Sequence, residues 1–336
     1  MDEHQMQFAD QDDEFAPRGL PGFIEGMAVF AIDPVSRISV THNFFAAADG
    51  SDQCHQTLSV NLPDGRVAAL SEPRPLEVVP TTAWSDFRYE QIEPFRRWTV
   101  SFDGSAAFVR QDEALRRVID DPERHPLAFE LELSSVTPPW RPPTTPLAAP
   151  LPEPIGDSNV FGFFVQNVEV QGHVRCEGRD LDLTGTGWRL HVRAAPWELD
   201  VIGHHFVHVV FPSGRAFGLQ VVQTSAGEYS LPAYVFEDGK LHDAVVREIT
   251  DWTRLRGHGE HPTIVLERAD GVVAEVSGET LNNAAIANGR GGYGVDFSDP
   301  DAVVMLFADT RWTWDGEDAY GVWERTKRVG LLDRGD

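Results

Sequence analysis

Residues 203–212 (GHHFVHVVFP) hold three of the twelve histidines of the chain, His204, His205 and His208. The valines and phenylalanines between them favour a β-strand. Side chains alternate between the two faces of a strand, so His204 and His208 share the face of Phe206, and His205 lies on the other. On such a strand His204 and His208 are about 13 Å apart, at 3.3 Å per residue. A shared zinc needs ligands about 2 Å from the ion.

We therefore expect no metal site in this stretch. A neutral imidazole in a mostly apolar barrel can instead carry protons near pH 7. The face of the strand that points inward decides whether His204 and His208, or His205, would do so. A role in the core or at a barrel rim is the alternative.

Glu324, in the stretch VWERT, is the candidate acid. Val322 and Trp323 precede it, and burial among such side chains would raise its pKa towards the range of a general acid. The alternative is an exposed glutamate that pairs with Arg325 or Arg328.

Arg189, His191 and Arg193 alternate along residues 189–193 (RLHVR), so one face of a strand would carry all three. Burying two cations and an imidazole is costly unless carboxylates pair with them. This face is therefore a solvated outer surface, a rim or an anion-binding wall, and His191 is a candidate catalytic residue.

Large aromatic residues are plentiful, with nine tryptophans and 20 phenylalanines. Such rings can shape an apolar binding site or stabilise a carbocation, although most rings in β-barrels belong to the core. Together with Arg189, the candidates for substrate binding are Trp188, Phe206, Trp312 and Trp323.

Short alternating strands joined by Asp-Gly or Ser-Gly turns recur along the sequence and predict antiparallel sandwiches or barrels. Residues 56–70 predict a hairpin that turns at Pro63-Asp64-Gly65, and residues 96–110 repeat the pattern around Asp103-Gly104. Residues 112–123 predict one helix, and the Gly- and Asn-rich residues 280–296 predict a loop.

Residues 136–154 contain eight prolines and predict an extended linker, the alternative being a long loop inside one domain. We thus expect an all-β protein with two lipocalin-like barrels or sandwiches and a proline-rich connection. The predicted parts are a disordered acidic tail (1–17), an N-terminal β domain (18–135), the linker (136–157) and a C-terminal β domain (158–330).

Composition excludes several classes of function. The net charge is −25 and only two lysines are present, which argues against a nucleic-acid partner. No run of about 18 apolar residues exists, so membrane insertion is not expected. Two cysteines are too few for a disulfide framework, which favours a reducing cytoplasm.

Three stretches resemble a known family: residues 93–104 (EPFRRWTVSFDG), 163–195 and 318–329 (DAYGVWERTKRV). Together they are similar to the AttH-like, carotenoid 1,2-hydratase-like family, whose members contain two lipocalin-like β domains. The resemblance extends over roughly residues 20 to 330.

The family's glycine-rich turn and its Arg and His match Gly185, Gly187, Arg189 and His191 in GTGWRLHVR. The sequence departs from the family at Leu190, where the family usually has an aspartate. That acid is the natural proton donor for hydrating or cyclising an alkene. If the chemistry persists, another group must donate the proton.

The predicted function is that of a cofactor-independent enzyme acting on a small hydrophobic substrate: a terpenoid, a polyketide or an aromatic compound. Proton transfer would hydrate, dehydrate, cyclise or isomerise it, with His191, His204, His208 and Glu324 as the catalytic candidates. The alternative is a non-catalytic carrier of hydrophobic molecules. Formation of a homo-oligomer stays open.

Overall fold

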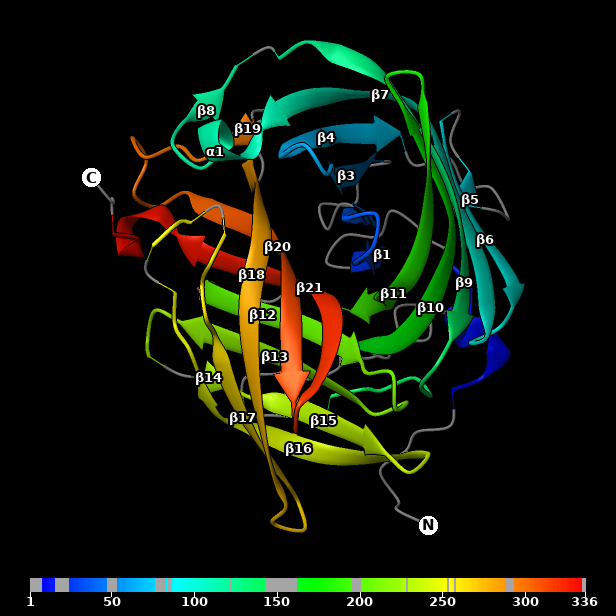
Figure 1. Cartoon of the computed structure of the whole chain (residues 1–336), viewed down its shortest axis with the longest axis vertical. Coiled ribbons are helices and arrows are strands. Elements are labelled where there is room, and N and C mark those ends of the chain that lie inside the picture. Colours follow the sequence, from blue (N-terminus) through cyan, green and yellow to red (C-terminus); the bar gives the residue numbers. More distant parts are fainter. Residues whose placement is uncertain are drawn as a thin grey trace.

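The computed structural model describes residues 8–15, 24–46, 53–75, 82–83, 86–120, 122–142, 162–194, 201–227, 229–252, 254–256, 258–287 and 293–333. Nearly all of its regular structure is antiparallel β-strand, as the recurring turn signals predicted. The strands form two sheets, each curved round its own core (Figure 1). No helix among the described residues is long and apolar enough to cross a bilayer.

The first sheet, here barrel 1, closes because β4 pairs with β7. Its strands are β1 (Ile24–Asp33), β2 (Ile38–Ala46), β3 (Gln53–Asn61), β4 (Arg66–Pro75), β5 (Thr82–Ala83), β6 (Phe87–Glu93), β7 (Arg97–Arg110), β9 (Arg124–Ser135), β10 (Gly162–Cys176) and β11 (Arg179–Ala194). The closed ring follows the order β4-β3-β2-β1-β11-β10-β9-β7, with β6 and β5 continuing beyond β7.

The second sheet, barrel 2, follows the order β17-β16-β15-β13-β12-β21-β20-β18, and β17 pairs with β18 to complete the ring. Its strands are β12 (Val201–Val210), β13 (Ala216–Thr224), β14 (Tyr229–Ser230), β15 (Pro232–Glu237), β16 (Lys240–Ile249), β17 (Thr263–Arg268), β18 (Val273–Ala287), β19 (Tyr293–Gly294), β20 (Val303–Trp314) and β21 (Glu317–Arg328). The short strand β8 (Val118–Ile119) pairs with β19 and so ties the first half of the chain to this sheet.

The strand pairing differs from the predicted division of the chain. Strands β10 and β11 follow the proline-rich stretch, yet β11 pairs with β1 and β10 pairs with β9. The change from barrel 1 to barrel 2 therefore lies between residues 194 and 201, and not near residue 158. Residues 143–157 of the predicted linker lie outside the described residues.

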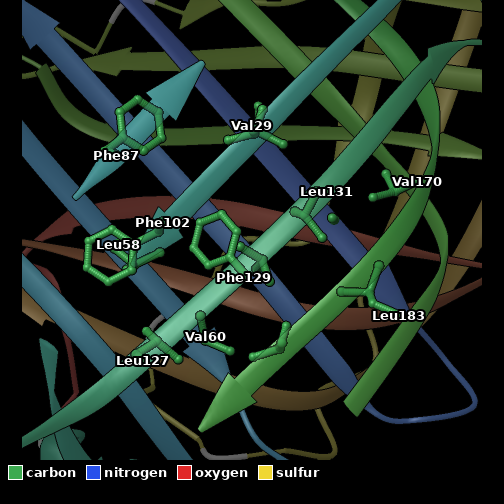
Figure 2. Packing of buried hydrophobic residues seen from close by; sticks show 14 of the residues in the cluster. Val29, Leu58, Val60, Phe87, Phe102, Leu127, Phe129, Leu131, Val170 and Leu183 are labelled. Atoms are coloured by element: carbon green, nitrogen blue, oxygen red, sulfur yellow. The ribbon is translucent and has the colours of Figure 1, made fainter. Parts of the chain in front are cut away.

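Alternation along the strands divides the apolar residues into three cores. In β1, Val29 points into barrel 1 and Phe30 points away from it. Figure 2 shows the core of barrel 1, where Phe102 and Phe129 lie among aliphatic side chains. A second core, the inter-barrel core, joins the outer faces of both barrels and includes Phe30, Trp188, Leu190, Phe206, Phe307 and Val322. The third fills barrel 2. Burial of each large apolar side chain contributes about 1.5–3 kcal/mol.

Three local predictions are wrong. Asp103 and Gly104 lie inside the continuous strand β7 and form no turn, because β9 pairs along most of that strand. The predicted helix at 112–123 is reduced to α1 (Gln111–Ala114), followed by β8. Residues 280–287 continue β18 because β20 supplies their hydrogen bonds, while residues 288–292 lie outside the described part.

The described residues of the predicted disordered tail are ordered against barrel 1. Residues 10–13 form the 3₁₀ helix η1 (Asp10–Asp13), in which Asp12 and Asp13 are buried. Phe8 packs against Phe95 and Phe164. A second 3₁₀ turn, η2 (Val329–Leu331), follows β21 near the end of the chain.

Candidate active site

The predicted site residues occupy three places in the fold. Arg189 and His191 face the interior of barrel 1, and Trp312 and Trp323 belong to the core of barrel 2. The other five share the inter-barrel face: Trp188, His204, Phe206, His208 and Glu324. The Trp188 ring centroid lies 4.9 Å from that of Phe206 and 5.0 Å from that of His208, so these rings form one aromatic group.

Strand register places Glu324 among phenylalanine rings. Strand β21 lies between β12 and β20, where Glu324 is directly opposite Phe206 on one side and Phe307 on the other. Directly opposite residues of antiparallel strands point to the same face. Trp323, its neighbour in sequence, points into barrel 2 instead. Glu324 is therefore buried by two neighbouring strands and by Val322 on the same face of β21, and not by Trp323.

His204 is the polar neighbour of Glu324. Its Nδ1 lies 3.6 Å from Glu324 Oε1, and the two side chains are 15% and 10% exposed, so both retain some accessible surface. Burial raises the pKa of Glu324 to about 8 and lowers the pKa of His204 to about 4. Near pH 7 the proton stays on the carboxyl, so the contact joins a neutral acid to a neutral imidazole and is no ion pair.

His208 is held by a hydrogen-bonded chain between the barrels. Asn167 Nδ2 donates to the Tyr234 hydroxyl at 2.8 Å, and this hydroxyl shares a hydrogen bond with His208 Nδ1 at 3.2 Å. Gly218 lies between His208 and Tyr234 in the sheet, and a Cβ there would lie 2.0 Å from His208 Nδ1. The glycine thus permits this contact. Burial lowers the pKa of His208 well below its ordinary value, so the ring is neutral.

Among the described residues, no group of three or more His, Cys, Asp or Glu side chains is arranged to hold a metal ion.

The histidines of β12 point to both faces of this strand. His205 points into barrel 2, where its ring stacks on Trp323 at 5.5 Å, while His204 and His208 point to the inter-barrel side. Therefore His204 and His208, and not His205, are on the face of the aromatic group.

Asp309 is a further acid on this face that sequence reasoning missed. It accepts hydrogen bonds from Asn282 Nδ2 at 2.5 Å and from Asn61 Nδ2 of barrel 1 at 3.3 Å. Asp309 is opposite Val322. It is therefore a diagonal neighbour of Glu324, with Cα atoms about 7–8 Å apart. Burial raises the pKa of Asp309 to about 6. A lone aspartate within the apolar run MLFAD was the available signal.

The predicted Arg-His-Arg face is buried inside barrel 1, and not solvated. Glu25 Oε1 accepts from His191 Nε2 at 3.2 Å and from Arg193 Nη2 at 2.7 Å. Burial opposes ionisation of Glu25, but His191 and Arg193 outweigh it and hold the pKa of Glu25 below its ordinary value. Burial also lowers the pKa of His191. The carboxylates that such burial requires are present, and His191 does not join His204 and Glu324.

The interior of barrel 2 carries another charged group. Arg325 Nη2 lies 2.9 Å from Glu260 Oε2 and donates to Asn283 Oδ1 at 2.6 Å. Its guanidinium lies over the Trp323 ring, with its Cζ 4.5 Å from the ring centroid. Trp312 packs edge-on against Trp323 at 5.6 Å. These two tryptophans therefore support the core and Arg325, on the side of β21 that faces away from Glu324.

No family model and no curated protein matches the sequence. Solved structures match its fold over nearly the whole chain. A protein assigned to AttH from Nitrosomonas europaea aligns with a TM-score of 0.62 at 11% identity, covering 98% of both chains. Kievitone hydratase from Nectria haematococca aligns with a TM-score of 0.55 at 8% identity, covering 97% of this chain and 94% of its own.

CghA aligns with a TM-score of 0.51 at 11% identity, covering 94% of this chain and 89% of its own. Its structure with Sch210972 aligns similarly, with a TM-score of 0.52. At these identities the likeness concerns the fold, and it agrees with the three stretches of sequence described above. The chain has the two-barrel fold of the AttH-like and carotenoid-hydratase-like proteins.

Proposed function

We propose that the chain is an enzyme that uses proton transfer at the inter-barrel face to hydrate, dehydrate, cyclise or isomerise a small hydrophobic substrate. One observation supports this most directly. Glu324 is a carboxylic acid that burial keeps protonated near pH 7, and it lies among aromatic rings beside a neutral imidazole. A carboxyl held neutral in this way is suited to act as a general acid.

The proposed reaction needs two groups whose pKa values are separated. Glu324 donates its proton to an alkene carbon, or to a hydroxyl that leaves as water. The rings of Trp188 and Phe206 stabilise the positive charge that develops on the substrate. In hydration, water adds to the neighbouring carbon, which bears this positive charge, and then gives its extra proton to a base. Asp309, with a pKa of about 6, is ionised at pH 7 and serves as that base.

Leu190 is compatible with this assignment of the acid. The family usually has an aspartate at this position, and Leu190 lies in the same inter-barrel core as Phe206, the residue opposite Glu324. The acid missing from β11 of barrel 1 is thus replaced by one from β21 of barrel 2. The hydration named for the Nectria haematococca enzyme is consistent with such chemistry.

Kievitone is a suitable first probe, followed by a panel of terpenoid, polyketide and aromatic alkenes. We expect conversion of at least one compound, with one deuterium from D₂O bound to carbon in the product, as detected by mass spectrometry. Glu324→Gln should lower conversion by at least about 100-fold, while Glu169→Gln, at an exposed position of β10, should retain it. Equal conversion by both variants would refute the role of Glu324.

A carrier of hydrophobic molecules is the second candidate, and the apolar Leu190 in place of an acid is the observation that favours it. Fluorescence of N-phenyl-1-naphthylamine, a neutral apolar probe, reports binding without chemistry. Micromolar binding of the probe, together with no turnover of any compound in the panel, would establish the carrier and exclude the enzyme.

A further inference from the structure

The carboxylate of Asp13 is bound by barrel 1 in the way a receptor binds a ligand. Its Oδ2 accepts from the backbone N–H of Phe95 at 2.7 Å, from Trp98 Nε1 at 2.9 Å and from Gln91 Nε2 at 3.0 Å. Its Oδ1 pairs with Arg189. All four donors belong to β6, β7, β11 or the turn between β6 and β7. Asp13 comes from η1, which is not part of the sheet.

The receptor side is positioned by contacts other than Asp13. Arg189 Nη2 donates to Gln166 Oε1 at 2.8 Å, and Nη1 lies 3.3 Å from the Tyr89 hydroxyl. The guanidinium also lies over the Trp98 ring, with its Cζ 3.8 Å from the ring centroid. Gln166 is in turn fixed by the carbonyl of Thr137 at 3.2 Å. These partners orient Arg189 but carry no negative charge, and a fully buried guanidinium requires one.

Two aromatic side chains on either side of Asp13 in the sequence, Phe8 and Phe15, also pack against barrel 1. The Phe8 ring lies 4.9 Å from Phe164, and the Phe15 ring packs edge-on against Phe44 at 4.9 Å. The segment around Asp13 thus presents a carboxylate together with phenyl rings, and barrel 1 receives both. A molecule that combines these two groups has the same chemistry.

We propose that barrel 1 contains a binding site for a small carboxylate with an adjoining aromatic ring, and that Asp13 is the occupant built into the chain. The donors of the site are Arg189, Trp98, Gln91 and the Phe95 N–H. Because β11 carries Arg189 on one face and Trp188 on the other, this site is separate from the proposed active site. A free carboxylate and η1 compete for the same donors.

Replacement of the occupant tests this directly. Asp13→Gly removes the carboxylate and leaves every donor in place. Phenylacetate should then raise the Tm of the variant saturably, by several degrees at millimolar concentrations, and phenylacetamide, its neutral analogue, should not. The control Asp10→Gly alters an exposed residue of the same helix and should show no such difference. Equal responses to the acid and the amide, or an equal response of the control, would overturn the proposal.

A second measurement uses the unaltered chain, in case Asp13→Gly does not fold. Hydrogen exchange of residues 8–15 should become several-fold faster as phenylacetate is added, because the ligand displaces η1, and phenylacetamide should have no effect. Phe15→Ala weakens the occupant without touching a donor, so the same increase should need less phenylacetate. Exchange that phenylacetate leaves unchanged in both proteins would contradict competition for this site.

Discussion

Ionisable groups on the two sides of β11 have opposite surroundings. Inside barrel 1 they pair with opposite charges, and on the inter-barrel face they lie among aromatic rings. Inside barrel 1 each buried cation has a carboxylate: Arg189 has Asp13, and Arg193 has Glu25. On the inter-barrel face Glu324 is close to His204 and to aromatic rings, and its pKa rises to about 8. Paired charges keep fixed protonation states, and the loss of one partner leaves the other charge buried and uncompensated. A buried acid without a cation retains its proton near neutral pH and can transfer it.

The largest effect should come from Glu324→Gln, which keeps the shape of the side chain and removes its acidic proton. We expect turnover to fall about 10²–10⁴-fold, the usual contribution of a general acid. Below about pH 4.5, where Glu324 is protonated in both the folded and the unfolded protein, the free energy of unfolding should change by less than about 1 kcal/mol, because a neutral group replaces a neutral group. Initial rates and urea denaturation measure the two quantities. A large loss of stability with unchanged rates would show that Glu324 stabilises the fold and does not transfer a proton.

Asp13→Asn should show the opposite behaviour. It leaves Arg189 buried without a carboxylate, and breaking a buried pair in this way costs about 3–5 kcal/mol. Urea denaturation at pH 7 provides the measurement, with Asp10→Asn as a control that should stay within about 0.5 kcal/mol of the parent. If both variants have the same free energy of unfolding, the Asp13–Arg189 ion pair contributes no stability to barrel 1.

The pH dependence of stability offers a finer test. The folded pKa of Glu324, about 8, lies above the unfolded value of 4.5, so its contribution is full below pH 4.5 and is lost as the pH rises to about 8. His204 has the opposite slope between its folded pKa of about 4 and its unfolded 6.5. Glu324 therefore dominates between pH 6.5 and 8.

In that window the chain should lose about 1–2 kcal/mol of unfolding free energy, whereas Glu324→Gln should lose none of this amount. Turnover should decline over the same range as the acid loses its proton. Chemical denaturation at several pH values is the measurement, and a parallel decline in the variant would assign the slope to another group.

The smallest effect on turnover is expected for Tyr234→Phe, which removes the hydroxyl between His208 and Asn167. The two lost hydrogen bonds correspond to about 2 kcal/mol of unfolding free energy. Turnover should fall only a few-fold, because His208 is neutral and positions the aromatic group. A loss as large as that of Glu324→Gln would indicate that the proton donor is Tyr234 or His208, and not Glu324.

The sequence was sufficient for two of the hairpins, because their turns are local, but not at Asp103-Gly104, which lies inside β7. The predicted turn at Asp64-Gly65 joins β3 and β4, and the one at Ser213-Gly214 joins β12 and β13. It was insufficient for the pairing of β1 with β11, which brings Phe30 beside Trp188 across more than 150 residues. No local pattern records such a partner, and the predicted division of the chain failed there.

The candidate site likewise combines features that follow from the local sequence with features that depend on distant parts of the chain. Alternation along β12 correctly separated His204 and His208 from His205, because parity is a local property. The raised pKa of Glu324 was predicted, but its cause lies in Phe206 and Phe307 on two other strands. Asp309 was missed, since its burial depends on contacts with Asn61 of barrel 1. Its role as a base stays a proposal.

The position of β10 and β11 in barrel 1 also has a consequence for biosynthesis. Until the ribosome has delivered β10, β9 has no partner on one side, and until it has delivered β11, β1 has none, so both expose open strand edges. Such edges invite association with other chains. More than half of the polypeptide must therefore emerge before the first barrel can close, and a fragment that stops within the proline-rich stretch would be an incomplete barrel prone to aggregate.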